Sequence, residues 1–254
     1  MEYLILGLLG LSWGSFANVC IYRLPKDKKG FILGRSFCPS CKKKIKWFDN
    51  IPLISFLLLS AKCRFCKKKI SSQYFYVEAF TAFLFIIFFY FFGISFTTLF
   101  LIILSVFAII IFFIDFKHFI IPNELTFSLM FLSLLKLLDS NLNLVIFSNF
   151  QDSMIGGTAG YLLVFFIVQF YRKVRKKEGM GMGDAKLLSA IGFWFGWYSI
   201  PFIMFISSAI ALVTVVPSLI QKSKKFDSII PFGPFIILGT VLFLVISNYT
   251  NLIK

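Results

Sequence analysis

Long apolar runs alternate with short basic segments along the chain. A helix that crosses a bilayer needs about 20 predominantly apolar residues, and four runs fit one crossing each: 3–22, 119–138, 153–171 and 229–250. The run 119–138 is the weaker prediction, because Glu124 and Lys136 interrupt it. Two longer runs, 79–114 and 187–221, contain no charged residue and are each long enough for two helices. The pattern therefore predicts an all-α polytopic membrane protein with about eight transmembrane helices.

Turn-forming residues divide both of the long runs. Gly93-Ile94-Ser95 predicts a tight turn in the first run. In the second run we expect a break near Trp197–Pro201, where interfacial aromatic residues meet a helix breaker. Beyond the apolar runs themselves, we recognise no internal repeat.

The composition excludes most classes of soluble protein. Of the 254 residues, 59% are hydrophobic and 15% are charged, and the mean hydropathy is +0.88. Soluble domains have roughly 45–50% apolar and about 25% charged residues. A net charge of +15 would suggest nucleic acid as the partner of a soluble protein. Here the cations cluster between apolar runs, so we expect membrane lipid as a partner and no nucleic acid.

The basic residues also orient the chain in the membrane. With the N-terminus outside, 24 of the 26 Lys and Arg residues fall in the inside loops, which are 23–72, 115–118, 172–186 and 221–228. Cytoplasmic loops of membrane proteins carry this excess of positive charge. The sequence predicts a multi-pass membrane protein whose N-terminus lies outside and whose largest loop is cytosolic.

Two Cys-x-x-Cys pairs lie in that largest loop, Cys38 with Cys41 and Cys63 with Cys66. Four thiolates with no histidine nearby fit a closed tetrahedral Zn²⁺ site, which would hold together a loop too short to bury its own core. Two disulfides are the alternative, and the reducing cytosol disfavours them. We expect Cys20, in the first run, to be a packing residue.

Two aspartates lie at the ends of predicted spans. Asp115 ends the third span and Asp184 begins the sixth, so both fall at the cytosolic edge. Such a pair suits peptide hydrolysis, because one carboxylate can activate water while the other, protonated, polarises the carbonyl. Two alternatives stay open: ordinary helix-end charges neutralised by Lys117 and Lys186, and ion binding as in a transporter.

Helix dipoles distinguish the two aspartates. Asp184 begins a helix, where the dipole favours a carboxylate, and Asp115 ends one, where it favours the neutral acid. We expect Asp184 to be the base and Asp115 the acid, as a preference within a pair that titrates as a unit.

Further motifs occur in an order that is typical of one enzyme family. They are Gly14–Val19, Tyr22–Pro25, the two cysteine pairs, Asp49–Pro52, Ser71–Glu78, Asp115 with Ile121-Pro122 and Leu125-Thr126, Glu178–Leu187, and Ile230–Pro234. The chain resembles the bacterial prepilin peptidases, membrane aspartic proteases with a Gly-x-Gly-Asp motif, over nearly its whole length. Asn123 stands where this family often has Asp.

The resemblance implies an enzyme that cleaves the leader peptide of type IV prepilins or pseudopilins at the cytosolic membrane face, with Asp115 and Asp184 as its catalytic residues. It also implies N-methylation of the new N-terminal residue with S-adenosylmethionine, an activity associated with the zinc-binding loop. Three regions follow: residues 1–22 as the first transmembrane helix, 23–73 as the methyltransferase-associated zinc loop, and 74–254 as the peptidase membrane domain.

The residues that bind S-adenosylmethionine are not assigned by the resemblance. Glu78 is a candidate, and pairing with Lys or Arg at a helix end is its alternative role. Two other functions stay open for the chain. One is a peptidase alone, in which zinc serves only the fold, and the other is a non-enzymatic transporter or scaffold whose acids bind ions.

Overall fold

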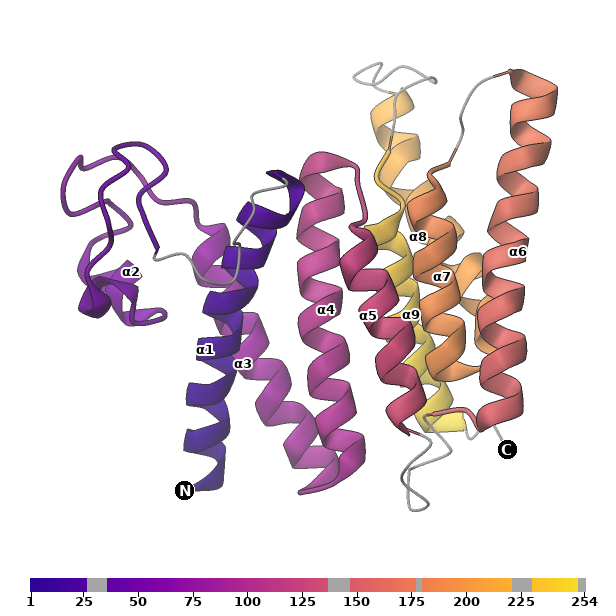
Figure 1. The fold of residues 1–254 in the computed structure, drawn as a ribbon, viewed down its shortest axis with the longest axis horizontal. Coiled ribbons are helices and arrows are strands. Elements are labelled where there is room, and N and C mark those ends of the chain that lie inside the picture. Colours follow the sequence, from indigo (N-terminus) through magenta and orange to yellow (C-terminus); the bar gives the residue numbers. More distant parts are fainter. Residues whose placement is uncertain (27–35, 137–146, 177–179, 221–229, 251–254) are drawn as a thin grey trace. The chain divides into compact units, whose positions relative to one another are not determined.

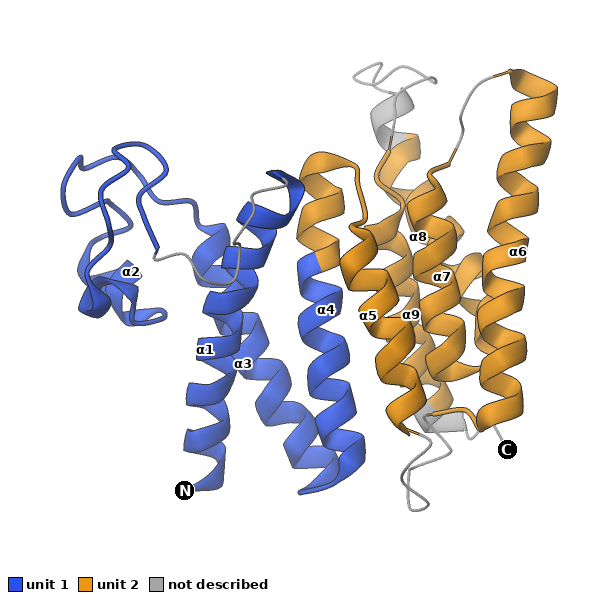
Figure 2. Cartoon of the chain, in the orientation of Figure 1, with its two compact units in different colours: residues 1–110 blue, residues 111–254 orange. Residues whose placement is uncertain are grey.

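A computed structural model describes the chain apart from 27–35, 137–146, 177–179, 221–229 and 251–254. The chain divides into two compact units, unit 1 (Met1–Ile110) and unit 2 (Ile111–Lys254), shown in different colours in Figure 2. The described residues form helices and contain two isolated β-bridges but no named strand. The predicted all-α class is therefore confirmed.

Each predicted span corresponds to a helix in the described part of the chain. These helices are α1 (Glu2–Arg23), α3 (Gln73–Phe92), α4 (Phe96–His118), α5 (Asn123–Leu135), α6 (Phe150–Arg175), α7 (Met182–Phe195), α8 (Ser199–Ile220) and α9 (Gly233–Thr250), as drawn in Figure 1. By length and composition, α1, α3, α4, α6 and α8 can each cross a membrane, whereas α5 and α9 are shorter apolar helices. The 14 residues of α7 extend about 21 Å, less than the thickness of a bilayer core, which is about 30 Å.

The predicted divisions of the two long runs are found with one correction. Gly93 ends α3 with a φ of +59°, as expected of the tight turn. The second break lies at the start of the predicted segment, because Gly196 (φ +80°) ends α7 and α8 begins at Ser199. Pro201 therefore lies in the first turn of α8, where its missing N–H would have no intrahelical partner in any case.

Unit 1 is built on the packing of α1 against α3. Gly10 and Gly14 face α3 so closely that an added Cβ would lie 2.6 Å and 2.7 Å from backbone atoms of Ala82 and Glu78. Small residues allow such close approach of helices in membranes. The loop that follows α1 contains short helical turns, which are η1 (Leu24–Lys26), η2 (Trp47–Asn50) and α2 (Ile54–Leu58).

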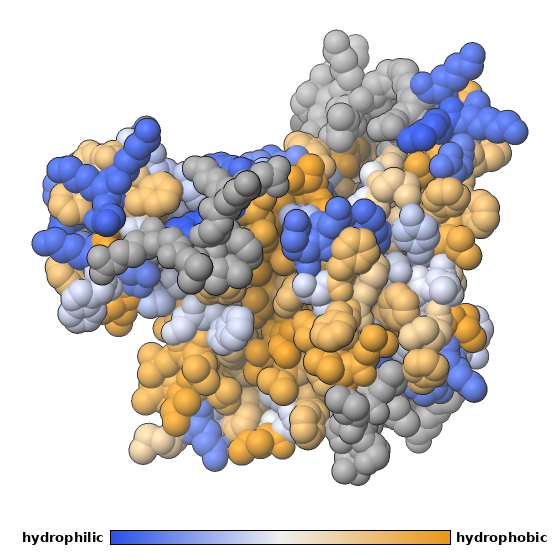
Figure 3. Space-filling model, in the orientation of Figure 1, coloured by the Kyte–Doolittle hydropathy of each residue, from blue (hydrophilic) through white to orange (hydrophobic). Residues whose placement is uncertain are grey.

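Unit 2 is organised around α7, which packs against α5, α6, α8 and α9. Most residues of α7 are buried, and its Gly192 meets Gly156 of α6 backbone to backbone. Apolar side chains cover the visible outer faces of the helices in Figure 3, and hydrophilic ones gather over the cysteine loop and the end of α6. Exposed apolar helix faces are what lipid requires.

The far end of α7 is capped by a buried lysine. Lys136, 1% exposed, donates hydrogen bonds to the carbonyl oxygens of Phe193 (2.6 Å) and Trp194 (2.8 Å) and to the Ser148 hydroxyl (3.0 Å). These carbonyls belong to the last turn of the helix and have no intrahelical partner. Lys136 thus ties the end of α5 to the end of α7.

Candidate catalytic pair and metal centre

The cysteine loop contains two copies of one short structure. In the first, the Cys38 N–H donates to the Lys43 carbonyl (3.0 Å) and the Lys42 N–H to the Cys38 carbonyl (2.8 Å). In the second, the corresponding bonds run from Cys63 to Lys68 (2.9 Å) and from Lys67 to Cys63 (3.0 Å).

The same turn geometry is repeated in both copies. The backbone φ angle is +58° at Lys42 and +57° at Lys67. An antiparallel bridge closes each copy, Phe37 with Lys44 and Lys62 with Lys69. The interpretation that the chain has no internal repeat is wrong here, because Cys-x-x-Cys-Lys-Lys-Lys-Ile occurs at both 38–45 and 63–70.

The two copies bring their four cysteines together. The sulfur atoms of Cys38, Cys41, Cys63 and Cys66 all lie within 4.8 Å of one another, and Cys38 Sγ is 3.9 Å from Cys66 Sγ. Four thiolates bound to one Zn²⁺ at 2.3 Å would lie about 3.8 Å apart. The cysteines are not bonded to each other. The cluster can therefore hold a metal ion, and its spacing fits the tetrahedral thiolate shell.

Local hydrogen bonds favour the thiolate form of Cys63. The backbone N–H groups of Cys66 and Phe65 point at the Cys63 sulfur and lower the pKa of that thiol to about 7. The thiolate is the form that binds metal. Next to it, Arg64 donates to Asp49 over 2.6 Å and holds the pKa of the Asp49 carboxyl below its usual value, which ties the second copy to η2.

Asp115 and Asp184 lie at one end of unit 2. Asp115 is buried in the last turn of α4, and its Oδ2 accepts a hydrogen bond from the N–H of Gly233 (2.9 Å), the first residue of α9. Asp184 is buried in the first turn of α7, where its Oδ2 accepts from the N–H of Gly181 (3.2 Å). The two carboxyl groups are near enough for their charges to interact.

Ile121 lies between the segments that carry the two aspartates. A Cβ added to Gly183 or to Gly233 would lie 3.1 Å from Ile121 side-chain atoms. Glycine at both positions lets α7 and α9 approach this side chain and the aspartates closely. Glu178 and Gly179, in the first part of the glycine-rich motif, lie outside the described residues.

The lysine beside Asp184 has a different partner. Lys186 Nζ donates to Asn123 Oδ1 over 2.7 Å and lies 5.6 Å from the centre of the Phe127 ring. Asn123, the departure from the family pattern, thus links the start of α5 to α7. Lys186 is therefore placed to orient α5 and not to neutralise Asp184.

Glu78 lies in α3 and is 6% exposed. Its Oε2 accepts a hydrogen bond from the Leu53 N–H (2.8 Å), and the Ser15 hydroxyl also bonds to this carboxylate. Among the described residues its recorded partners are thus a backbone amide and a hydroxyl, and not the lysine or arginine considered from the sequence. Leu53 has a φ of +57°, in the conformation that aims its N–H at Glu78.

Known proteins resemble the chain over almost its full length. Residues 8–92 match the bacterial peptidase A24 N-terminal domain, and residues 102–216 match the type IV leader peptidase family. A protein of Vibrio cholerae named prepilin leader peptidase/N-methyltransferase is 37% identical over 95% of this chain and 97% of its own length. Proteins of the same name from Neisseria gonorrhoeae (34% over 93% and 88%) and Legionella pneumophila (31% over 94% and 90%) are similar.

No solved structure matches the chain. The relatives and the apolar helices together make it a multi-pass protein of the inner membrane. With family matches over 8–92 and 102–216 and nearly full-length relatives above 30% identity, this chain belongs to the type IV leader peptidase family.

Proposed function

We propose that this chain is a membrane aspartic endopeptidase that removes the leader peptide from type IV prepilins or pseudopilins. The observation that carries the proposal is that the buried Asp115 and Asp184 lie at one end of unit 2, beside Gly233 and Gly183, which both approach Ile121. The name of the relatives supplies the substrate class. Membrane lipid surrounds the helices, and nucleic acid has no part in this function.

The two aspartates divide the work of hydrolysis. One carboxylate takes a proton from water, and the resulting hydroxide adds to the carbonyl carbon of the scissile peptide. The other, protonated, gives its proton to the carbonyl oxygen. When the tetrahedral intermediate collapses, the C–N bond breaks and the amine leaves with a proton. The buried pair shares one proton, because two close carboxylates do not both ionise readily.

Zn²⁺ is the metal that we assign to Cys38, Cys41, Cys63 and Cys66. A closed shell of four thiolates leaves no open position for a substrate. The ion would therefore hold the two short turns together, and residues of the loop would do no metal-assisted chemistry.

N-methylation is the second proposed activity, since the relatives are named N-methyltransferases as well as peptidases. S-adenosylmethionine would supply the methyl group. We assign this step to the region of the cysteine loop (23–73), beside the first helix (1–22), and the peptidase to residues 74–254. A peptidase alone, with zinc serving the fold, is the alternative for the loop.

The orientation of the chain in the membrane follows from the positive charge of its loops. The N-terminus would lie outside, and the cysteine loop and both aspartates on the cytosolic side, where 24 of the 26 Lys and Arg residues fall. A prepilin, with an apolar helix in the bilayer and a basic leader, would then present its scissile bond at the level of Asp115 and Asp184.

The test uses purified full-length protein in lipid, a prepilin and S-adenosylmethionine, and reads the mass of the intact product. Wild type is expected to remove the leader and add one methyl group. Asp115→Asn and Asp184→Asn should each abolish cleavage. Asp152→Asn, in the first turn of α6, is the matched control and should cleave normally.

Three outcomes separate the functions. Cleavage without a methyl group, with zinc bound, would support the peptidase alone. Normal cleavage by both aspartate variants would refute the assigned pair. An uncleaved precursor together with ion flux would favour a transporter, and the two aspartates would then be ion ligands.

A further inference from the structure

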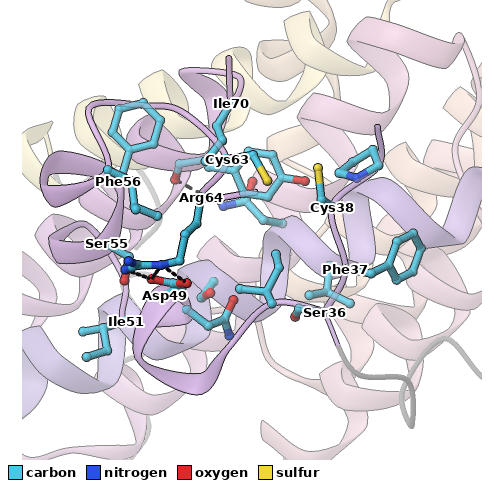
Figure 4. Close-up of a pocket in the computed structure, with 18 of the residues that line it drawn as sticks. Ser36, Phe37, Cys38, Asp49, Ile51, Ser55, Phe56, Cys63, Arg64 and Ile70 are labelled. Carbon is cyan, nitrogen blue, oxygen red and sulfur yellow. Dashed lines mark hydrogen bonds and ion pairs between the residues drawn. The ribbon is translucent and has the colours of Figure 1, made fainter. Parts of the chain in front are cut away.

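A pocket of about 180 Å³ lies within unit 1, between α1, α3 and the cysteine loop (Figure 4). Side chains from α1 and α3 line one part of it, and residues 36–70 of the loop line the rest. Both cysteine pairs contribute a wall, through Cys38 and Cys63, which Figure 4 shows on the same side of the pocket. Neither Asp115 nor Asp184 is among the residues that line it.

A buried polar group forms part of the lining. Glu78, which lines the pocket from α3, is almost fully buried. Asn18, on α1, is 2% exposed; it donates to the Tyr74 carbonyl (3.2 Å) and accepts from the Gln73 side chain (3.4 Å). A carboxylate buried in this way is costly unless something offsets its charge. Its two recorded partners, the Leu53 N–H and Ser15, are neutral.

Aromatic rings line the same pocket. Tyr22 and Phe37 meet edge to face with ring centres 6.3 Å apart, and Phe56 also belongs to the lining. The faces of such rings attract organic cations. Two cations of the chain already lie over these rings, Lys26 over Tyr22 (3.6 Å) and Arg23 over Phe37 (6.0 Å). The lining also holds Arg64, which pairs with Asp49. Among the described residues Glu78 is thus the lining carboxylate with no recorded charged partner, and it favours a compact cation beside it.

The methyl donor of the proposed second activity is such a cation, because its methyl group is attached to a positively charged sulfonium. We propose that the unit 1 pocket holds the sulfonium end of the methyl donor, with the Glu78 carboxylate beside its positive charge. Pockets for whole drug-sized ligands measure about 300–1,000 Å³. The smaller volume here fits the charged end of the donor and leaves the remainder at the mouth. This inference rests on the proposed methyl transfer, and it extends the site of that transfer from the loop (23–73) to Glu78 of α3.

Methyl transfer needs only the methyl donor, the new N-terminal amine and water. The new N-terminal ammonium, whose pKa is ordinarily about 7.7–8.0, releases one proton to water. The nitrogen lone pair of the neutral amine then forms a bond to the methyl carbon as the carbon–sulfur bond breaks. The electron pair of that bond stays on sulfur, which leaves as a neutral thioether, and the positive charge passes to nitrogen. Glu78 faces positive charge both before and after transfer, so its role is to bind and orient.

The role of Cys38 and Cys63 follows from the same arrangement. They line the pocket and are two members of the metal cluster. A bound metal would fix their positions and with them this wall. The inference thus gives the metal loop a reason to lie beside the helices of unit 1.

The test measures binding directly, by equilibrium dialysis of full-length protein in lipid. Two ligands are compared: S-adenosylmethionine, which is positively charged at sulfur, and S-adenosylhomocysteine, which is neutral there. Glu78→Gln keeps the shape and still accepts the Leu53 N–H. It is expected to weaken S-adenosylmethionine binding by about tenfold or more and to leave S-adenosylhomocysteine binding unchanged. Glu2→Gln, an exposed carboxylate of the same unit, is the matched control and should change neither.

A second variant places a larger side chain in the unit 1 pocket. Val19 lines the pocket from α1, and Val19→Phe should weaken binding of both ligands while cleavage of the prepilin leader continues. Ile5→Phe, on the exposed part of the same helix, should bind both normally. Retained cleavage shows in each case that the variant has folded.

The outcomes separate this inference from the proposed function. If wild type methylates but Glu78→Gln and Val19→Phe bind S-adenosylmethionine as wild type does, the pocket is not the donor site. If Glu78→Gln weakens both ligands equally, Glu78 does not face the sulfonium, and the inference is wrong in that part. If wild type neither methylates nor binds the donor, the proposed methyl transfer itself fails.

Discussion

Gly233 joins the last helix of the chain to the proposed catalytic pair. Its N–H bonds to Asp115 Oδ2, and an added Cβ would lie only 2.7 Å from the same oxygen. Real Cβ atoms do not approach so closely, so either the aspartate or the start of α9 would have to move. The position requires glycine because of this close approach.

Gly233→Ala is therefore expected to reduce leader cleavage by about one to two orders of magnitude, since small displacements of a catalytic group are costly. The rate of leader removal in lipid measures the effect. Gly7→Ala is the control, because its added Cβ would meet only the Ile86 side chain at an ordinary 3.5 Å. A Gly233→Ala protein that cleaves at the wild-type rate would show that Asp115 does not depend on this contact.

Gly233 also alters the expected roles of the two aspartates. From the sequence, Asp115 lies at the end of its helix and Asp184 at the start of another, and this difference suggested acid and base. In the structure Asp115 also lies at the start of α9, through its bond to Gly233. Both carboxyl groups thus face a helix N-terminus, and helix dipoles no longer distinguish them.

At the scale of elements, hydrophobic runs predicted the helices because lipid forces backbone polar groups to pair within each segment. The turn at Gly93 was also predictable from local sequence, because glycine readily adopts the positive φ that this turn requires. Lys136 was not, since it appeared only as a cation that weakens the span 119–138. Its partners Phe193 and Trp194 are more than 50 residues away in the sequence. No local sequence pattern predicts these contacts. Gly233 was missed as a contact of Asp115 for the same reason.

Lys136→Met should lower the thermal stability of the protein in detergent. It leaves the Phe193 carbonyl without this donor, whereas the Trp194 carbonyl still accepts from the Ser148 N–H (3.2 Å). An unsatisfied buried group costs about 1–3 kcal/mol. Removal of a buried charge offsets part of this cost, so we expect a fall of several degrees in Tm, on the scale of a change of about 1–2 kcal/mol. Thermal unfolding of Lys173→Met, an exposed lysine of α6, provides the comparison. An unchanged Tm for Lys136→Met would mean that the cap contributes no net stability.

At the scale of the whole molecule, the two proposed activities draw their residues from different units. All four clustered cysteines belong to unit 1, and both aspartates belong to unit 2. Pairing of the aspartates followed from topology, because alternating spans bring the end of one helix and the start of another to the same side. The eight-residue repeat around the cysteines was present in the sequence and was overlooked because the repeats are short.

Loss of the metal should therefore affect the two activities unequally. Cys66→Ser is expected to abolish stoichiometric zinc binding, as measured by metal content, and to reduce methyl transfer severely. Leader cleavage should persist near the wild-type rate, because Asp115 and Asp184 have their own packed surroundings. Cys20→Ser, outside the cluster, is the control. An equal loss of cleavage would mean that the loop also serves the peptidase.

The orientation in the membrane can be tested with single cysteines placed at opposite ends of the helices. Ile94, 88% exposed in the turn between α3 and α4, should lie outside, whereas Lys173, near the basic end of α6, should lie inside. Ile94→Cys is expected to react with a membrane-impermeant maleimide in intact spheroplasts, and Lys173→Cys only after the membrane is opened. Unmodified protein sets the background from the native cysteines. Labelling of Lys173→Cys in intact spheroplasts would show that the topology is the reverse of the predicted one. The basic loops and the paired aspartates would then lie outside the cell membrane.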